Sequence, residues 1–283
     1  MTSLDVSNNT LLYDLFCFEN ELTSLVVSNN TLLTTINCRS NQISSLDFSQ
    51  NLLLEDIVIA SNNLSNLDVS MLPNLLDLSC SNNPLNSLGV TQNPLLTVLV
   101  CFSNGLTTLD ISNNTMLETL ACFNNQLTEF DLSAHPFLTE IWLLNNQLTS
   151  LDLRNGANTN IIEDDFNVTG NQNLTCISVD DVAYSNANWT NIDTQTSFDV
   201  DCALSNEDFN SSSFSLYPNP TINSFTVASK VLITQVVIFD NLGREVAKFN
   251  GQESYNISHL NSGIYFVSIV SENNSQIKKL VVN

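Results

Sequence analysis

Five cysteines recur at multiples of 21 residues, and thiols in such a pattern could bind a metal ion or carry out redox chemistry. They are Cys17, Cys38, Cys80, Cys101 and Cys122. The same step places Ile59 and Leu143 at the two remaining positions of the series. A metal ligand could not be replaced by isoleucine or leucine, whereas a buried free cysteine behaves as a small apolar residue. We therefore predict a buried thiol ladder, with no metal and no other cofactor.

Two polar series follow the same step of 21 residues. The aspartates are Asp5, Asp47, Asp68, Asp110, Asp131 and Asp152, and the asparagines are Asn20, Asn41, Asn62, Asn83, Asn104, Asn125 and Asn146. Carboxylates about 5 Å apart in water repel by only ~1 kcal/mol, so we interpret the aspartates as a solvated column, with divalent cation binding as the alternative. Asparagine tolerates tight turns and hydrogen-bonds to backbone, which indicates a structural role.

The sequence contains no recognisable catalytic motif. HExxH, CxxC and a glycine-rich phosphate-binding loop are all absent. His135 occupies a turn-asparagine position, and His259 lies in the C-terminal segment. We therefore predict that the protein is not an enzyme.

All of these series belong to one repeat of 21 residues, close to LTxLDVSxNTxLxxLxCxxNQ. A fixed short period indicates a solenoid, in which one coil cannot bury its apolar face alone and stacks on its neighbours. Each half of the repeat has apolar residues two apart, the pattern of a short strand with both side chains inward. We predict a mainly β, leucine-rich repeat solenoid over residues 1–160, with a parallel sheet on one side and short strands or extended segments on the other.

The outward positions of the LxC strands vary from coil to coil, so the scaffold does not dictate them. The predicted ligand-binding face consists of Phe16, Phe18, Asn37, Arg39, Val100, Phe102, Ala121, Phe123, Trp142 and Leu144. Exposed apolar patches mark interaction sites, although aromatic residues also suit any strand surface. We expect Phe102, Phe123, Trp142 and Leu144 to be contiguous and to form the centre of the face.

Charge is distributed unevenly along the chain. Residues 1–204 contain 23 acidic and two basic residues, whereas residues 205–283 contain six acidic and five basic residues. A strongly acidic surface repels phosphate backbones and anionic lipids, so nucleic acid is excluded as a partner. The charge fits either solubility in a salty medium or binding of cations or of a basic protein. No stretch approaches the roughly 18–20 apolar residues of a membrane-spanning helix, and we predict no transmembrane segment.

The remaining residues differ from the repeats in composition. Residues 161–204 break the period, and we predict a C-terminal cap closed by a disulfide between Cys176 and Cys202, with two free thiols as the alternative. Residues 205–213 are small and polar, as in a flexible linker. In residues 214–283, short apolar runs separated by Asn- and Gly-containing turns predict a small antiparallel β-sandwich.

Two resemblances add expectations about function. The repeat text, LxxLxCxxNQLTxLDVSxN, resembles the cysteine-ladder repeats of internalin J and related bacterial surface proteins, which implies an adhesin-like or ligand-binding role. LYPNPT (216–221), VVIFDNLGREV (236–246), LNSGIYFVSIV (260–270) and KKLVVN (278–283) are similar to the type IX secretion sorting domain of Bacteroidetes. That similarity implies a secreted or outer-membrane surface-anchored bacterial protein, which contacts the secretion machinery through residues 214–283 and is often cleaved there.

Together these features predict a secreted or cell-surface adhesion protein that binds a protein or glycan through the strand face. The alternatives are an accessory binding region of a larger surface enzyme and a structural component of a surface layer. The repeat text is already in register at Met1, and no signal peptide precedes it. We therefore expect further sequence upstream.

Overall fold

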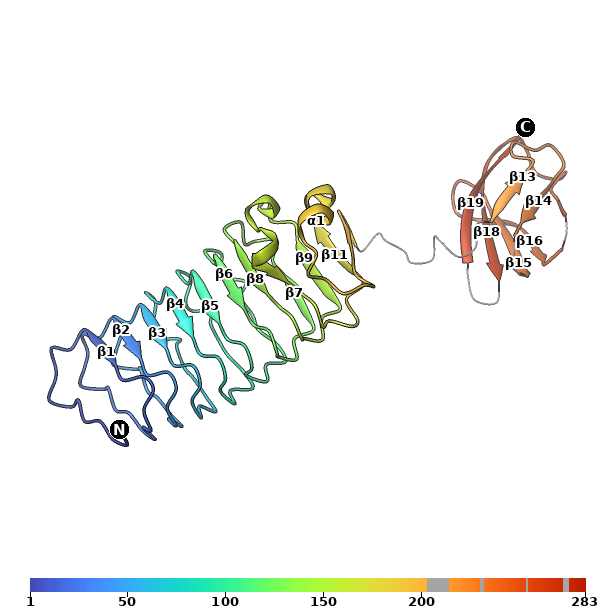
Figure 1. Ribbon diagram of the computed structural model, residues 1–283. Coiled ribbons are helices and arrows are strands. Elements are labelled where there is room, and N and C mark those ends of the chain that lie inside the picture. The colour runs from blue at the N-terminus through green and yellow to red at the C-terminus, as the bar shows by residue number, and fades with distance from the viewer. Residues whose placement is uncertain (203–213, 230–231, 253, 272–274) are drawn as a thin grey trace. The chain divides into compact units, whose positions relative to one another are not determined.

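The computed structural model describes residues 1–202, 214–229, 232–252, 254–271 and 275–283. The predicted linker, residues 205–213, lies outside the described residues. The chain divides into two compact units, Met1–Cys202 and Ala203–Asn283 (Figure 1). No helix in the described part of the chain is long and apolar enough to cross a membrane.

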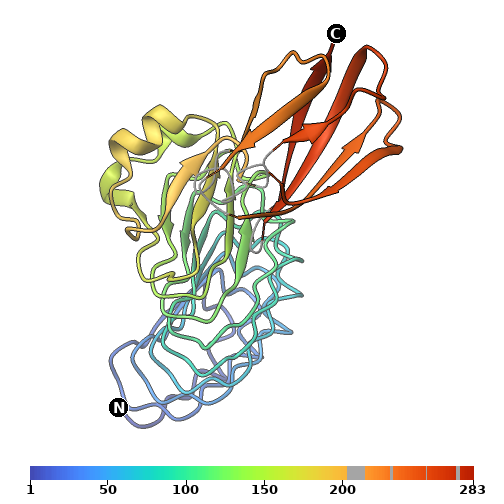
Figure 2. The same ribbon diagram turned by 90° about the vertical axis from the view of Figure 1, so that its right-hand side faces the viewer.

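One side of the first unit is a parallel sheet of eight short strands in the order β1-β2-β3-β4-β5-β6-β8-β10 (Figures 1 and 2). These strands are β1 (Asp14–Phe16), β2 (Thr35–Asn37), β3 (Asp56–Val58), β4 (Asp77–Ser79), β5 (Val98–Val100), β6 (Thr119–Ala121), β8 (Glu140–Trp142) and β10 (Phe166–Asn167). Neighbouring repeats pair in register, as Leu99 of β5 does with Leu120 of β6. Each middle residue is buried, so the coils share one core and the predicted solenoid is confirmed.

The other side of the coils becomes regular only near the C-terminal end of the unit. There β7 (Glu129–Asp131), β9 (Ser150–Leu153), β11 (Cys176–Val179) and β12 (Ser197–Asp199) form a parallel sheet in the order β12-β11-β9-β7. In earlier coils this side is extended and forms no named strand, apart from an isolated bridge between Asp68 and Gly89. Backbone pairing on this side therefore contributes least at the N-terminal end.

The thiol ladder lies inside the core. All five of its cysteines are free and buried, and Ile59 and Leu143 fill the same column without exposure. Burial raises the pKa of the Cys38 thiol to about 12, and it raises the pKa of Cys80 as well. Because the thiolate is the nucleophile and metal ligand, Cys38 and Cys80 act as apolar packing contacts.

The asparagine series ties each turn to the next coil. Asn125 donates through Nδ2 to the carbonyls of Cys122 and Cys101 at 3.0 and 3.1 Å. Its Oδ1 accepts from the N–H groups of Asn104 and Leu106, both at 3.0 Å. The left-handed backbone of the turn falls on the residue before the asparagine, for example Asn124 with φ of 54°. The asparagine itself is needed for its amide, which pairs buried backbone groups on two coils.

A second ladder of buried asparagines, which the sequence analysis did not single out, holds the opposite turn. It consists of Asn30, Asn51, Asn93 and Asn114. Asn114, for example, donates through Nδ2 to the carbonyls of Asn93 and Val90 at 2.8 and 2.9 Å. His135 takes the next position, with Nε2 3.1 Å from the carbonyl oxygen of Ile111. The histidine is therefore a structural substitute for asparagine.

Stacking continues beyond the end of the repeat text. β10, β11 and β12 extend the two sheets through residues 161–202, together with two 3-10 turns (Asn158–Asn160 and Glu163–Asp165) and the helix α1 (Val182–Asn188). Asn171 lies outside the 21-residue register, yet it donates to Leu143 and Val168 and accepts from Leu148 as a ladder asparagine does. Trp189 is buried against Phe166 at a ring distance of 4.4 Å and closes the end of the core.

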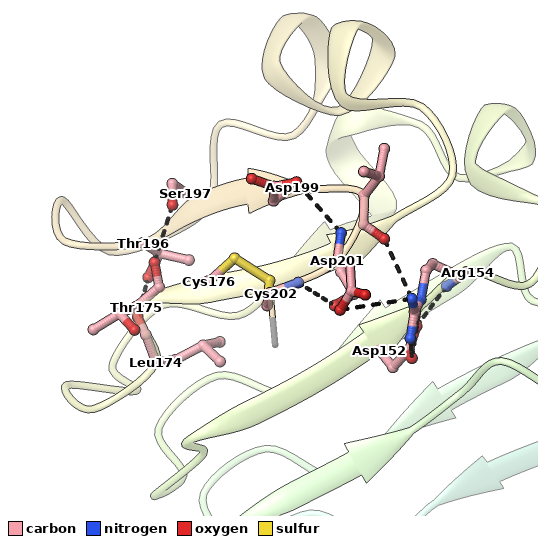
Figure 3. Close-up of a disulfide and its surroundings, with 12 residues drawn as sticks. Asp152, Arg154, Leu174, Thr175, Cys176, Thr196, Ser197, Asp199, Asp201 and Cys202 are labelled. Carbon is pink, nitrogen blue, oxygen red and sulfur yellow. Dashed lines mark hydrogen bonds and ion pairs between the residues drawn. A yellow bond between two sulfur atoms is a disulfide. The ribbon is translucent and has the colours of Figure 1, made fainter. Parts of the chain in front are cut away.

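A disulfide between Cys176 and Cys202 fastens the last segment of the first unit (Figure 3). Arg154 lies beside it, binds Asp152 through its guanidinium and donates to the carbonyl of Val200 at 3.3 Å. The backbone N–H of Cys202 donates to Ser178 Oγ at 3.2 Å. The end of the solenoid is thus held both covalently and by hydrogen bonds to β11 and to Arg154, the residue after β9.

The second unit contains two antiparallel sheets. One has the order β13-β14-β17 and the other β16-β15-β18-β19. Their strands are β13 (Ser215–Tyr217), β14 (Ser224–Ala228), β15 (Ile233–Phe239), β16 (Glu245–Asn250), β17 (Tyr255–Asn256), β18 (Gly263–Ser271) and β19 (Ser275–Val282). Phe225 and Tyr255 from the first sheet share a core with Val236 and Ile269 from the second.

Replacing a ladder asparagine by alanine should destabilise the solenoid strongly. Asn125→Ala removes five hydrogen bonds and leaves buried backbone groups unpaired, so we expect the free energy of unfolding in urea to fall by roughly 2–4 kcal/mol. Asn113→Ala is the matched control, because Asn113 is exposed and its side chain makes one bond, to the Thr91 carbonyl. Equal midpoints for the two variants would contradict the ladder's role.

Removing the disulfide should lower the stability of the solenoid's C-terminal end. The bond closes a loop with a sequence separation of 26, for which chain entropy gives about 3–4 kcal/mol. We expect Cys176→Ser with Cys202→Ser to unfold at lower urea concentration than the wild type, and a reductant should shift the wild type alone. A wild-type midpoint that does not respond to reductant would argue against the bond.

Candidate functional site

The strand face consists of three outward columns. Two columns come from the first and third residues of the seven strands β1 to β6 and β8, and the third column follows one residue after the buried cysteine position. Most side chains of the predicted binding face are half-buried by their neighbours, whereas Phe16, Phe18 and Arg39 are exposed. The face is rigid, because β pairing and the asparagine ladder fix the backbone of every coil.

Aromatic side chains gather at the C-terminal part of this face. The rings of Phe102 and Phe123 are stacked, with their centroids 4.1 Å apart and their planes 10° apart. Trp142 and Leu144 lie on the next coil, where Trp142 pairs in register with Ala121. We call Phe102, Phe123, Trp142 and Leu144 the aromatic cluster. Its flat, half-buried rings present an apolar surface held in one geometry.

A separate group lies at the N-terminal end. The guanidinium of Arg39 lies 5.2 Å from the ring centroid of Phe18 and 3.2 Å from the carboxylate of Glu19. Coils with small side chains, such as Ser79 and Ser81, lie between this group and the aromatic cluster. The structure therefore divides the predicted face into two parts instead of bringing all its residues together.

Ala121 does not belong to the accessible surface. It was predicted as an outward binding residue, but only 7% of it is exposed. Its in-register neighbours are Val100 and Trp142, and a methyl group between two larger side chains is covered by them. Ala121 thus acts as a spacer between its neighbours.

Two aspartates on adjacent strands were missed by the sequence analysis. Asp56 of β3 and Asp77 of β4 are directly paired in register at the first outward position. Burial, and then the nearby Asp56 carboxylate, raise the pKa of Asp77 to about 6, and burial raises the pKa of Asp56. The signal was present in the sequence as carboxylates preceding apolar strand residues, but their half-burial depends on the neighbouring coils.

The aspartate column has a structural use in its own turns. Oδ1 of Asp5, Asp47, Asp68, Asp110 and Asp131 accepts from the backbone N–H of the serine two residues later, at 2.9–3.0 Å. These bonds to Ser112 lower the pKa of Asp110, and Arg154 lowers that of Asp152. Among the described residues, no group of three or more His, Cys, Asp or Glu side chains is arranged to hold a metal ion.

A hollow lies on the side opposite the strand face. It has a volume of about 630 Å³ and is lined by residues of three consecutive coils, among them Asp110, Glu129, Asp131 and Asp152. Hydroxyl groups of Thr107, Thr108 and Ser150 also line it. Its acidic side chains are exposed or half-buried and open to solvent.

Both parts of the chain are similar to known proteins. Residues 215–283 match the family model of the secretion system C-terminal sorting domain. The functional domain of InlJ from Listeria monocytogenes, which includes a cysteine ladder, is 25% identical with a TM-score of 0.51, covering 100% of this chain and 64% of that one. An internalin, InlF, from the same organism is 22% identical with a TM-score of 0.53, covering 70% of this chain and 57% of that one.

These matches show a solenoid that resembles InlJ in its cysteine ladder, followed by a sorting domain. The sorting domain indicates a secreted or cell-surface protein. The chain spans less than two thirds of the length of these two internalin structures. No curated protein sequence matches the chain.

Asp77→Asn should stabilise the protein at neutral pH and have little effect in acid. The folded-state pKa of about 6 lies above the usual range, so the stability associated with protonated Asp77 is present below about pH 4 and is lost as pH rises through 6. Asp77 is partly exposed, and solvent screening reduces the effect. We therefore expect the free energy of unfolding of Asp77→Asn to exceed that of the wild type by about 1 kcal/mol at pH 7.5. Urea unfolding at pH 4 and pH 7.5 measures it.

Asp110→Asn serves as the control with the opposite sign, because hydrogen bonds to Ser112 lower the pKa of Asp110. Relative to the wild type, Asp110→Asn should not become more stable between pH 4 and pH 7.5. A pH-independent effect of Asp77→Asn would show that charge at this position does not matter.

Proposed function

We propose that this chain, a cysteine-ladder solenoid joined to a secretion sorting domain, is an adhesion protein that binds a protein or glycan ligand through its strand face. The stacked pair of Phe102 and Phe123 at 4.1 Å carries the proposal. Rings fixed in this way offer an apolar contact at low entropic cost, because little side-chain freedom remains to be lost on binding. Trp142 and Leu144 extend that contact on the next coil.

The rest of the chain fits a binding role. Internalin-like repeats and sorting domains are typically non-catalytic, and the buried thiols have no access to a substrate. The carboxylates around the coils disfavour nucleic acid and anionic surfaces as ligands. The sorting domain would interact with the secretion machinery and so deliver the solenoid to the cell exterior. An extracellular ligand is available there.

Alanine substitutions in the aromatic cluster should weaken ligand binding without unfolding the solenoid. A glycan array and an array of purified extracellular proteins, both probed with the full chain, identify the ligand. We expect Phe123→Ala and Trp142→Ala each to weaken its binding by ten- to a hundredfold, as for aromatic hot spots worth about 1.4–2.8 kcal/mol.

Tyr217→Ala is the control, since Tyr217 is an exposed aromatic residue of the second unit and belongs to neither surface of the solenoid. It should leave the affinity unchanged. Unaltered affinity in both cluster variants, with thermal melting confirming their fold, would place the ligand elsewhere on the solenoid.

A further inference from the structure

A second apolar surface runs along the coils beside the strand face. It is formed by side chains 21 residues apart, each in the turn that precedes a strand of the eight-stranded sheet. We call these side chains the apolar ridge: Leu11, Leu32, Leu53, Leu95, Met116 and Phe137. Five of the six are exposed, from 42% for Met116 to 77% for Leu11. Asn74 interrupts the series, and there the neighbouring Leu76 is exposed instead.

The ridge has a fixed spacing. Its residues lie in turns closed by backbone hydrogen bonds, such as Leu117 N–H to the Asn114 carbonyl at 3.1 Å. Two residues further on, a continuous ladder of backbone hydrogen bonds joins the coils, including Glu118 N–H to the Thr97 carbonyl at 2.8 Å. The ridge side chains therefore recur at the separation of paired strands, about 4.8 Å.

This spacing selects the shape of the partner. Successive turns of an α-helix lie about 5.4 Å apart. The pitch of a helix therefore differs from the spacing of the ridge residues by only about 0.6 Å per coil. Side chains on one face of a strand are about 6.8 Å apart, a departure of about 2 Å per step. From Leu11 to Phe137 the ridge extends for roughly 29 Å, which about 20 residues of helix would cover.

The charge beside the apolar ridge indicates what charge the partner carries. A band of six carboxylates lies two or three residues after the ridge positions, and its members are Asp14, Glu55, Asp56, Asp77, Glu118 and Glu140. It includes the first column of the strand face and lies between the ridge and the columns that carry the aromatic cluster. No lysine or arginine occupies an equivalent position in these coils. Such a band attracts a basic partner and opposes both a second copy of this acidic solenoid and an anionic lipid surface.

We propose that the apolar ridge and its carboxylate band bind a basic amphipathic α-helix of a partner protein. The apolar face of the helix packs on the ridge, and lysines or arginines along one flank meet the carboxylates. This surface is separate from the aromatic cluster, which lies beyond the carboxylate band on the strand face. Each of the two surfaces is therefore testable without the other.

The probe is a synthetic peptide of about 21 residues, made of leucine and lysine with leucines at helical spacing. Its matched control has the same composition with strictly alternating leucine and lysine, the period of a strand. Titration calorimetry with the full chain should show binding of the helical peptide and at least about tenfold weaker binding of the alternating peptide.

Variants locate the contact. We expect two double variants each to weaken binding of the helical peptide at least about tenfold. One is Met116→Ser with Phe137→Ser, and the other is Leu53→Ser with Leu95→Ser. Val26→Ser with Met71→Ser is the control, because both residues are exposed and apolar but lie outside the ridge. Phe123→Ala should also leave peptide affinity unchanged, which separates this proposal from the strand-face function. Wild-type affinity in both ridge variants, or equal binding of the two peptides, would overturn it.

Discussion

The structure depends on the pairing of buried backbone groups where each coil turns. A coil of 21 residues has no helix in which its turns could satisfy their own N–H and C=O groups. The asparagine amides supply the missing partners, and each one bridges two coils, as Asn125 does between the carbonyls of Cys101 and Cys122. Because every amide pairs groups on two coils, the turns and the stacking stabilise each other.

Because stacking constrains the buried positions alone, the interior of the solenoid is uniform from coil to coil and the surface is not. The leucines, the thiol ladder and the asparagines have little freedom, since they fill a column that every coil shares. Outward positions carry no such constraint, and they differ between coils. The aromatic cluster, the apolar ridge and the carboxylate band between them are three adjacent surfaces of contrasting chemistry on one rigid support.

The same logic accounts for residues that first suggest chemistry. The thiols and His135 are buried structural residues, with the thiol pKa raised by burial at Cys38 and Cys80. The aspartate column caps its own turns through serine N–H groups. The unusual carboxylates are Asp56 and Asp77, which pair in the first column of the strand face and are half-buried there. Function is therefore better sought in surfaces than in reactive side chains.

The sequence by itself determined the coil and its buried columns, because an exact period states which residues share an environment. It also determined the sorting domain, through the text of residues 216–283. It could not determine how far neighbouring side chains cover one another. The tertiary structure decided that Ala121 is hidden between Val100 and Trp142, that Asp77 is half-buried beside Asp56, and that Asn171 continues the ladder out of register. Those outcomes depend on the sizes and positions of side chains one coil away, which lie close in space but 21 or more residues apart in the chain.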